Sequence, residues 1–103
     1  MQHKQVSTLN KNDILGFLSK NKKMLAQKFN VEQVALFGSY SRDEAREDSD
    51  IDIVITMTKK DFIKLFDFKE FLENHFHKTV NVTTFDGLRS FIKKHIEKDL
   101  IYA

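Results

Sequence analysis

The stretch Val34-Ala-Leu-Phe-Gly-Ser39 and, ten residues later, Asp50-Ile-Asp-Ile-Val-Ile-Thr-Met57 decide the fold expected of this chain. The first is a short apolar run closed by Gly-Ser, and its length and its glycine favour a buried strand. The second is rich in β-branched residues, which favours a central strand over 51–57. Because side chains alternate along a strand, Asp50 and Asp52 should point to one face, and the isoleucines at 51, 53 and 55 to the other.

Helices are expected before the first of these strands and after the second. Apolar residues at a spacing of 3.6 predict one amphipathic helix from Asn12 to Phe29, capped by Asn12 or Asp13. The segment Thr58-Lys-Lys-Asp61 has the spacing of a capping box and predicts a second helix that ends near residues 75–77.

A third strand and a closing helix complete the pattern. Residues 79–83 alternate like a strand, and apolar residues between Leu88 and Leu100 follow a helical period. The polar segment 40–50 is expected to be a loop with room for a helical turn. The predicted order is α-β-β-α-β-α, an α+β fold with helices packed on a small mixed sheet, as a single domain over residues 1–103.

The composition indicates one soluble, cytoplasmic domain of 103 residues, 41% of them hydrophobic. The absence of Cys excludes disulfides and thiolate metal sites. No apolar run reaches the length of a membrane span, and the N-terminus lacks the order of a secretion signal. Net charge is +2 with basic and acidic residues interspersed, so neither membrane interaction nor direct nucleic-acid binding is expected.

The two strands bring together groups suited to a nucleotide and its metal. Asp50 and Asp52 repel each other and are costly to desolvate, and a hard cation such as Mg²⁺ removes both penalties. Gly38 lets backbone amides approach a phosphate closely, and the hydroxyl of Ser39 adds a donor. Taken singly, the aspartate pair is more typical of a solvated strand end, and Gly-Ser is more typical of an ordinary turn. Their combination on adjacent strands predicts a site for a nucleotide with Mg²⁺.

Residues 34–42 and 49–54 resemble the minimal nucleotidyltransferase (MNT) group of the DNA polymerase beta superfamily, whose pattern is G-S-x10-D-x-D. The resemblance extends over nearly the whole chain and includes the ending Asp99-Leu-Ile-Tyr102. It implies the nucleotidyltransferase fold, ATP as substrate and Mg²⁺ as cofactor.

The resemblance also implies roles for single residues. The nucleotide-binding residues would be Gly38, Ser39, Arg42 and Ser49, with the first two at the β- and γ-phosphates. The metal ligands, which are also catalytic, would be Asp50 and Asp52. For Arg42, bracing the acidic loop against Asp43 or Asp48 is an equal alternative to a phosphate contact.

Two positions depart from the family pattern. Asn81, on the third strand, occupies the catalytic position where the family carries a third carboxylate, a metal ligand and probable base. An amide can ligate through its carbonyl oxygen but is uncharged and cannot accept a proton. Asp86 could substitute, although capping the last helix is the preferred interpretation. The second departure is Asp43, which stands where the family favours glycine.

The MNT group acts with helical HEPN-type nuclease toxins, so the resemblance implies a partner protein of that kind, with this chain as the antitoxin. One hypothesis is an enzyme that transfers AMP from ATP to the partner. A second is a catalytically weak nucleotide-binding module that inhibits or regulates a partner by contact. A third is a nucleotide-dependent regulator with no toxin partner.

Overall fold

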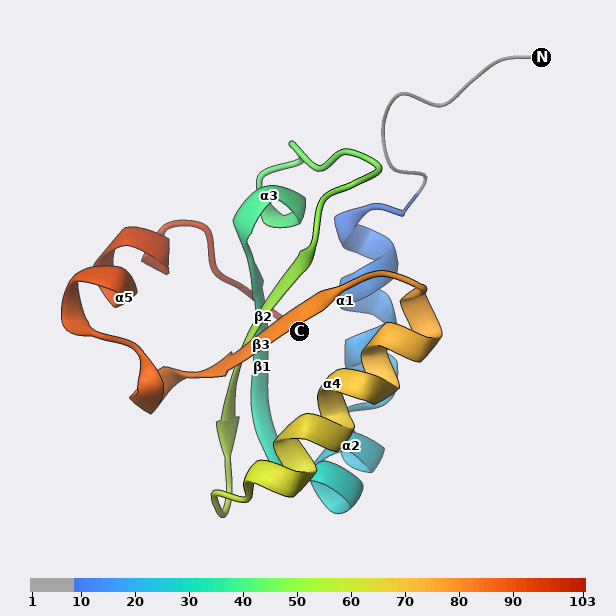
Figure 1. Ribbon diagram of the computed structural model, residues 1–103, viewed down its shortest axis with the longest axis vertical. Helices are drawn as coiled ribbons and strands as arrows, with labels where there is room; N and C mark the ends of the chain where they lie inside the picture. The colour runs from blue at the N-terminus through green and yellow to red at the C-terminus, as the bar shows by residue number, and fades with distance from the viewer. Residues whose placement is uncertain (1–8) are drawn as a thin grey trace.

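Strands β1 (Val31–Phe37) and β2 (Ile51–Met57) form the centre of a four-stranded sheet in the computed structural model, which describes residues 9–103 (Figure 1). They run antiparallel. On one side, β3 (Val80–Thr84) lies parallel to β2; on the other, the short β4 (Ile101–Tyr102) lies antiparallel to β1. The strand order is therefore β3-β2-β1-β4, and the predicted mixed sheet of three strands is confirmed, with β4 added.

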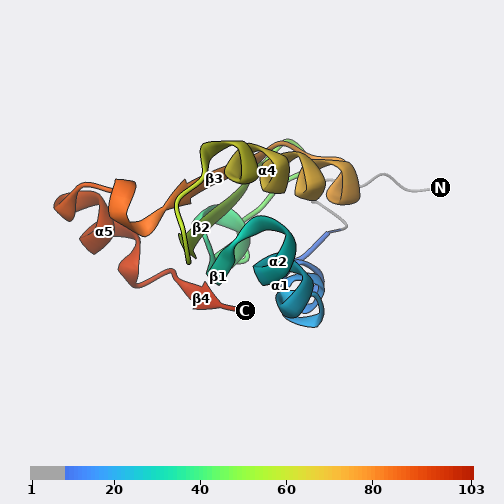
Figure 2. The ribbon, with the colours of Figure 1, turned by 90° about the horizontal axis from the view of Figure 1, so that it is seen from below.

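Three helices, α1 (Lys11–Lys20), α2 (Lys22–Phe29) and α4 (Phe62–Phe76), cover one face of this sheet (Figure 2). The alternate isoleucines of β2 point toward them, as predicted, and are fully buried. The other members of this core include Ile14, Leu18, Leu25, Phe29, Leu36, Phe68, Leu72 and Val80. No helix in residues 9–103 combines the length and the apolarity that a membrane span needs.

The single helix predicted from Asn12 to Phe29 is wrong, because the structure divides it at Asn21. The side-chain amide of Asn21 donates to the carbonyl of Phe17 at 2.8 Å and so competes with the helical hydrogen bonds of the backbone. The cap of α1 is Asn10 rather than Asn12 or Asp13, and it forms a reciprocal capping box with Asp13.

The helix after β2 begins later than predicted, at Phe62 rather than directly after Thr58. Asp61 itself is the cap of α4, and its carboxylate accepts a hydrogen bond from the backbone N–H of Lys64 at 3.1 Å. Thr58 therefore has no capping role, and that prediction is wrong. At its other end α4 stops at Phe76, in agreement with the expected end near residues 75–77.

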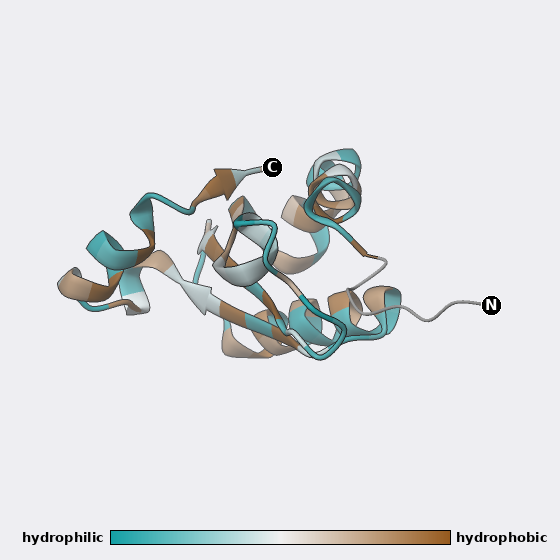
Figure 3. Ribbon diagram, turned by 90° about the horizontal axis from the view of Figure 1, so that it is seen from above, coloured by the Kyte–Doolittle hydropathy of each residue, from teal (hydrophilic) through white to brown (hydrophobic). Residues whose placement is uncertain are grey.

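After β3, the chain passes through a 3₁₀ turn, η1 (Phe85–Gly87), and α5 (Ser90–Glu97) before it returns as β4. Figure 2 shows α5 on the side of the sheet away from α1, α2 and α4. Hydrophilic and hydrophobic colours alternate along α5 in Figure 3, as expected for an amphipathic helix. The predicted closing helix is real but shorter than Leu88–Leu100, because the helix stops at Glu97 and residues 98–100 turn the chain into β4.

Candidate functional site

The turn that follows β1 lies against a carboxylate of β2. Residues Gly38–Ser41 form a single helical turn, α3, and Gly38 has a φ of +78°, in the left-handed region. A Cβ at Gly38 would collide with the carboxylate of Asp52, lying 3.0 Å from its Cγ. Only glycine therefore permits both this backbone conformation and this close approach.

Asp50, Asp52 and Asn81 converge beside this turn. In the sheet, Asp52 is paired with Phe37 on one side and with Asn81 on the other. The side-chain amide Nδ2 of Asn81 donates to Oδ1 of Asp52 at 3.0 Å and lies 3.4 Å from Oδ2 of Asp50. One amide thus contacts both carboxylates, which confirms that Asp50 and Asp52 lie on the same side.

The charge of this cluster is not balanced within the cluster itself. Asp50 and Asn81 are exposed and Asp52 is half-buried, and an amide contributes no formal charge. In the described residues, no group of three or more His, Cys, Asp and Glu side chains is placed to hold a metal. The donor set that remains, two carboxylates with an amide able to turn its oxygen inward, suits a hard cation such as Mg²⁺.

Arg42 braces α3, but with different partners from those predicted. Its Nε donates to Glu44 and its Nη1 to Asp99, both at 3.0 Å, and these hydrogen bonds raise the pKa of Arg42. The hydroxyl of Ser41 also donates to the backbone carbonyl of Asp99. Asp99 was not singled out from the sequence, although it begins the ending that resembles the family. A phosphate contact by Arg42 stays a prediction.

The loop between α3 and β2 has local explanations for two further residues. Asp43 has a φ of +59°, in the left-handed region that favours glycine, and it forms an ion pair with Lys11 at 3.0 Å. The hydroxyl of Ser49 accepts a hydrogen bond from the backbone N–H of Arg46 at 2.7 Å and closes a turn just before Asp50. Nucleotide contacts by Ser39 and Ser49 stay predictions.

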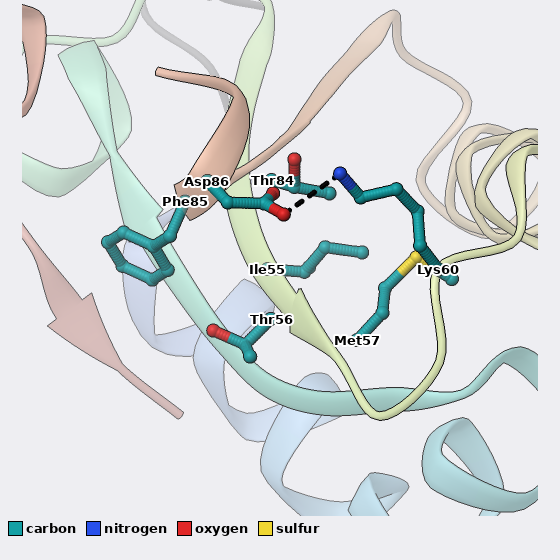
Figure 4. Close-up of a pocket in the computed structure, with 7 residues that line it drawn as sticks. All are labelled: Ile55, Thr56, Met57, Lys60, Thr84, Phe85 and Asp86. Carbon is teal, nitrogen blue, oxygen red and sulfur yellow. Dashed lines mark ion pairs between the residues drawn. The ribbon is translucent and has the colours of Figure 1, made fainter. Parts of the chain in front are cut away.

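Asp86 belongs to a different place in the structure (Figure 4). It follows β3 beside the end of β2 that is remote from Asp50, and it forms an ion pair with Lys60 at 2.9 Å. The hydrogen bond from Lys60 in this ion pair lowers the pKa of Asp86, and a second hydrogen bond from Thr84 lowers it further. Asp86 therefore does not replace the third carboxylate in this structure. It does not cap α5 either, since Arg89 is at that N-cap and makes no side-chain capping bond.

Comparison with known proteins gives consistent matches. The family model described as a nucleotidyltransferase domain matches residues 18–103. A Methanocaldococcus jannaschii protein named "putative protein adenylyltransferase" is 38% identical over 93 residues, which are 88% of this chain and 95% of that protein. The protein adenylyltransferase MntA of Thermococcus cleftensis is 33% identical over 92 residues, with 88% and 93% covered.

The fold is also found among solved structures. A chain in the crystal structure of a toxin–antitoxin with AMP-PNP is similar, with a TM-score of 0.68 and 21% sequence identity. The similarity covers 82% of this chain and 69% of that chain. At this level of identity the likeness is one of fold.

Proposed function

The chain belongs to the nucleotidyltransferase domain family, and from that premise we propose that it binds ATP with Mg²⁺ and transfers AMP to a partner protein. The partner would be a helical toxin of the HEPN type, and this chain its antitoxin in the cytoplasm. The observation that carries the proposal is the convergence of Asp50 and Asp52 beside the turn at Gly38. Relatives named protein adenylyltransferase and a toxin–antitoxin structure of similar fold support it.

Asp50 and Asp52 are the residues that would hold Mg²⁺. Their carboxylates already share one hydrogen-bond donor, the amide of Asn81, so a single positive ion could contact both. When bound, Mg²⁺ supplies neutralisation of phosphate charge and alignment of the reacting groups. The turn at Gly38 packs directly against the Asp52 carboxylate, so its backbone amides and the hydroxyl of Ser39 would be the donors to a phosphate group next to this pair.

The transfer itself is an in-line displacement. An acceptor hydroxyl of the partner attacks the α-phosphorus of ATP, the bond from that phosphorus to the bridging oxygen breaks, and pyrophosphate leaves. The proton of the hydroxyl must pass to a base, and the amide of Asn81 cannot take it. A slower transfer than in relatives with a third carboxylate is therefore part of the proposal.

Asn81 also favours the second candidate function, a catalytically weak module that binds a nucleotide and inhibits or regulates its partner by contact. In this case its amide serves mainly to hold the two carboxylates together. Both candidates require nucleotide binding at the same residues, and they differ in whether AMP becomes covalently attached to the partner.

Mass spectrometry of the intact partner separates the two candidates. The co-expressed partner is incubated with this protein, ATP and Mg²⁺, alongside the double variant Asp50→Asn/Asp52→Asn. We expect the partner to gain the mass of one or more AMP groups with the wild-type protein only. A stable complex in which the partner keeps its mass would instead support the contact mechanism. If the protein neither binds ATP nor modifies a partner, both candidates fail.

A further inference from the structure

A pocket of about 420 Å³ lies between η1, α5 and β4, and nothing in the site described above uses it. Its lining residues are Phe85, Lys93, Lys94, Glu97, Leu100 and Tyr102. The rings of Phe85 and Tyr102 stack with their centroids 6.2 Å apart and their planes inclined by 14°. We call this the aromatic pocket.

The aromatic pocket and the acidic pair share one face of the sheet. Tyr102 pairs with Ala35, Ala35 pairs with Val54, and Asp52 precedes Val54 by two residues on the same strand. Paired residues and residues two apart project to the same side of a sheet. The side chains of Tyr102 and Asp52 therefore both project away from α1, α2 and α4.

The separation of the two places suits one extended nucleotide. Two strand spacings and two residues of rise place the backbones of Tyr102 and Asp52 about 12 Å apart. That distance is comparable with the reach from the terminal phosphates of an extended nucleoside triphosphate to its base. A nucleotide with its phosphates beside Gly38 can thus lie across the sheet with its base near Tyr102.

The chemistry of the aromatic pocket fits a base. Phe85 and Tyr102 come from elements at opposite edges of the sheet, so their rings meet over the shared face rather than within one element. Tyr102 remains 54% exposed, which leaves part of its ring available for stacking. The amino groups of Lys93 and Lys94 and the carboxylate of Glu97 supply donors and acceptors for the polar edge of a base.

We infer that the aromatic pocket receives the base of the nucleotide whose phosphates lie at Gly38 and Asp52. This inference rests on the proposed function, because it requires a nucleotide at the acidic pair. It assigns Tyr102 and Phe85 to substrate binding and gives the C-terminal strand a role beyond extending the sheet.

The test separates binding of the base from binding of the phosphates. Calorimetry in the presence of Mg²⁺ compares ATP with inorganic triphosphate, which has no base, for the wild type, Tyr102→Ala and Tyr102→Phe. We expect Tyr102→Ala to weaken ATP binding by about 5- to 150-fold, the usual range for loss of one base–aromatic stack. Binding of triphosphate should stay unchanged, and Tyr102→Phe should behave as the wild type.

Three results would overturn the inference. Equal loss of ATP and triphosphate binding in Tyr102→Ala would mean that Tyr102 supports the fold of the site only. Unchanged ATP binding in Tyr102→Ala would mean that the base lies elsewhere. If the wild type binds neither ligand, the proposed function fails, and the inference fails with it.

Photolabelling provides a measurement without any substitution. Wild-type protein is irradiated with 8-azido-ATP and Mg²⁺, with unlabelled ATP as competitor, and the labelled peptides are identified by mass spectrometry. We expect competable label on peptides that contain Phe85 or residues 93–102. Competable label confined to other peptides would place the base outside the aromatic pocket and overturn the inference while leaving nucleotide binding intact.

Discussion

At one end of β2, Asp50 and Asp52 share the neutral amide of Asn81, whereas at the other end Asp86 forms an ion pair with Lys60. Both places present carboxylates from the sheet and its adjoining turns. Only the second balances its charge with its own residues. The difference shows where a cation is needed, because two adjacent carboxylates without a positive partner gain most from an added ion.

Among the substitutions considered, Asn81→Asp should have the largest effect, and that effect is on the rate of AMP transfer. This substitution would add a third carboxylate beside Asp50 and Asp52, and we expect the rate of AMP transfer to rise by about 10²–10⁴-fold, the usual contribution of a positioned base. ATP affinity in Mg²⁺ should change only modestly. The measurement is transfer of label from α-labelled ATP to the partner.

Without metal, the same variant should be less stable than the wild type. Three carboxylates in one place repel each other, so Asn81→Asp should melt at a lower temperature than the wild type in EDTA and recover in Mg²⁺. The matched control is Asp86→Ala, which should leave transfer unaltered because Asp86 lies at the other end of β2. Robust wild-type transfer that is lost in Asp86→Ala, with no gain in Asn81→Asp, would contradict this assignment.

A smaller effect is expected from Gly38→Ala, which removes the close approach between the turn and Asp52. The new methyl group adds overpacking to an unfavourable left-handed backbone, so the free energy of unfolding should fall by about 3 kcal/mol. Gly16 provides the control, because a Cβ there meets no heavy atom within 4 Å. Gly16→Ala lies inside α1 and should raise that free energy by about 0.5–1 kcal/mol.

Urea unfolding measures both glycine variants on one scale. If Gly38→Ala were as stable as the wild type, the collision between the turn and the Asp52 carboxylate would be relieved without cost. The turn would then not need glycine at position 38.

The smallest effect concerns pH. Glu73 of α4 accepts hydrogen bonds from the backbone N–H of Val80 at 3.0 Å and from Lys69 at 2.9 Å, and these lower its pKa, the first more than the second. Because the folded-state pKa is lowered, the stabilisation is present above the unfolded-state pKa and is lost as pH falls through the folded-state pKa.

The variant Glu73→Gln should therefore flatten the decline of the urea midpoint between about pH 5 and pH 3. The control is Asp86→Asn, whose ion pair with Lys60 is more exposed and should contribute less of this decline. A decline that is unchanged in Glu73→Gln would show that Glu73 is not a source of the acid sensitivity.

Local sequence patterns predicted the part of the fold that local physics determines. The β-branched run at 51–57 is a strand with those bounds, and the glycine turn and the two aspartates stand together as expected. The errors arose where a contact from outside the pattern decides the outcome. The apolar period continues past Asn21, but the helix is divided there, where the side chain of Asn21 donates to the carbonyl of Phe17. Strand β4 has two residues and is too short to show any period.

The same reason explains the errors at the candidate site. Asp86 has the spacing of a helix cap, but Lys60, 26 positions earlier in the sequence, is its partner. Arg42 was expected to contact either a phosphate or the acids Asp43 and Asp48 of its own loop, and one observed partner, Glu44, does lie in that loop. The other, Asp99, comes from the opposite end of the chain through the pairing of β4 with β1. No spacing rule in a single sequence carries that information.

We propose that the uncompensated pair Asp50 and Asp52 binds a nucleotide through Mg²⁺. Calorimetry of ATP binding in Mg²⁺ and in EDTA tests it most directly, for the wild type, the double variant Asp50→Asn/Asp52→Asn and the control Asp86→Asn. We expect wild-type and control affinities to fall by about 100-fold or more in EDTA, since a metal contributes several kcal/mol in such sites. The double variant should show the same weak affinity in both conditions. Equal wild-type affinity with and without metal would contradict the claim.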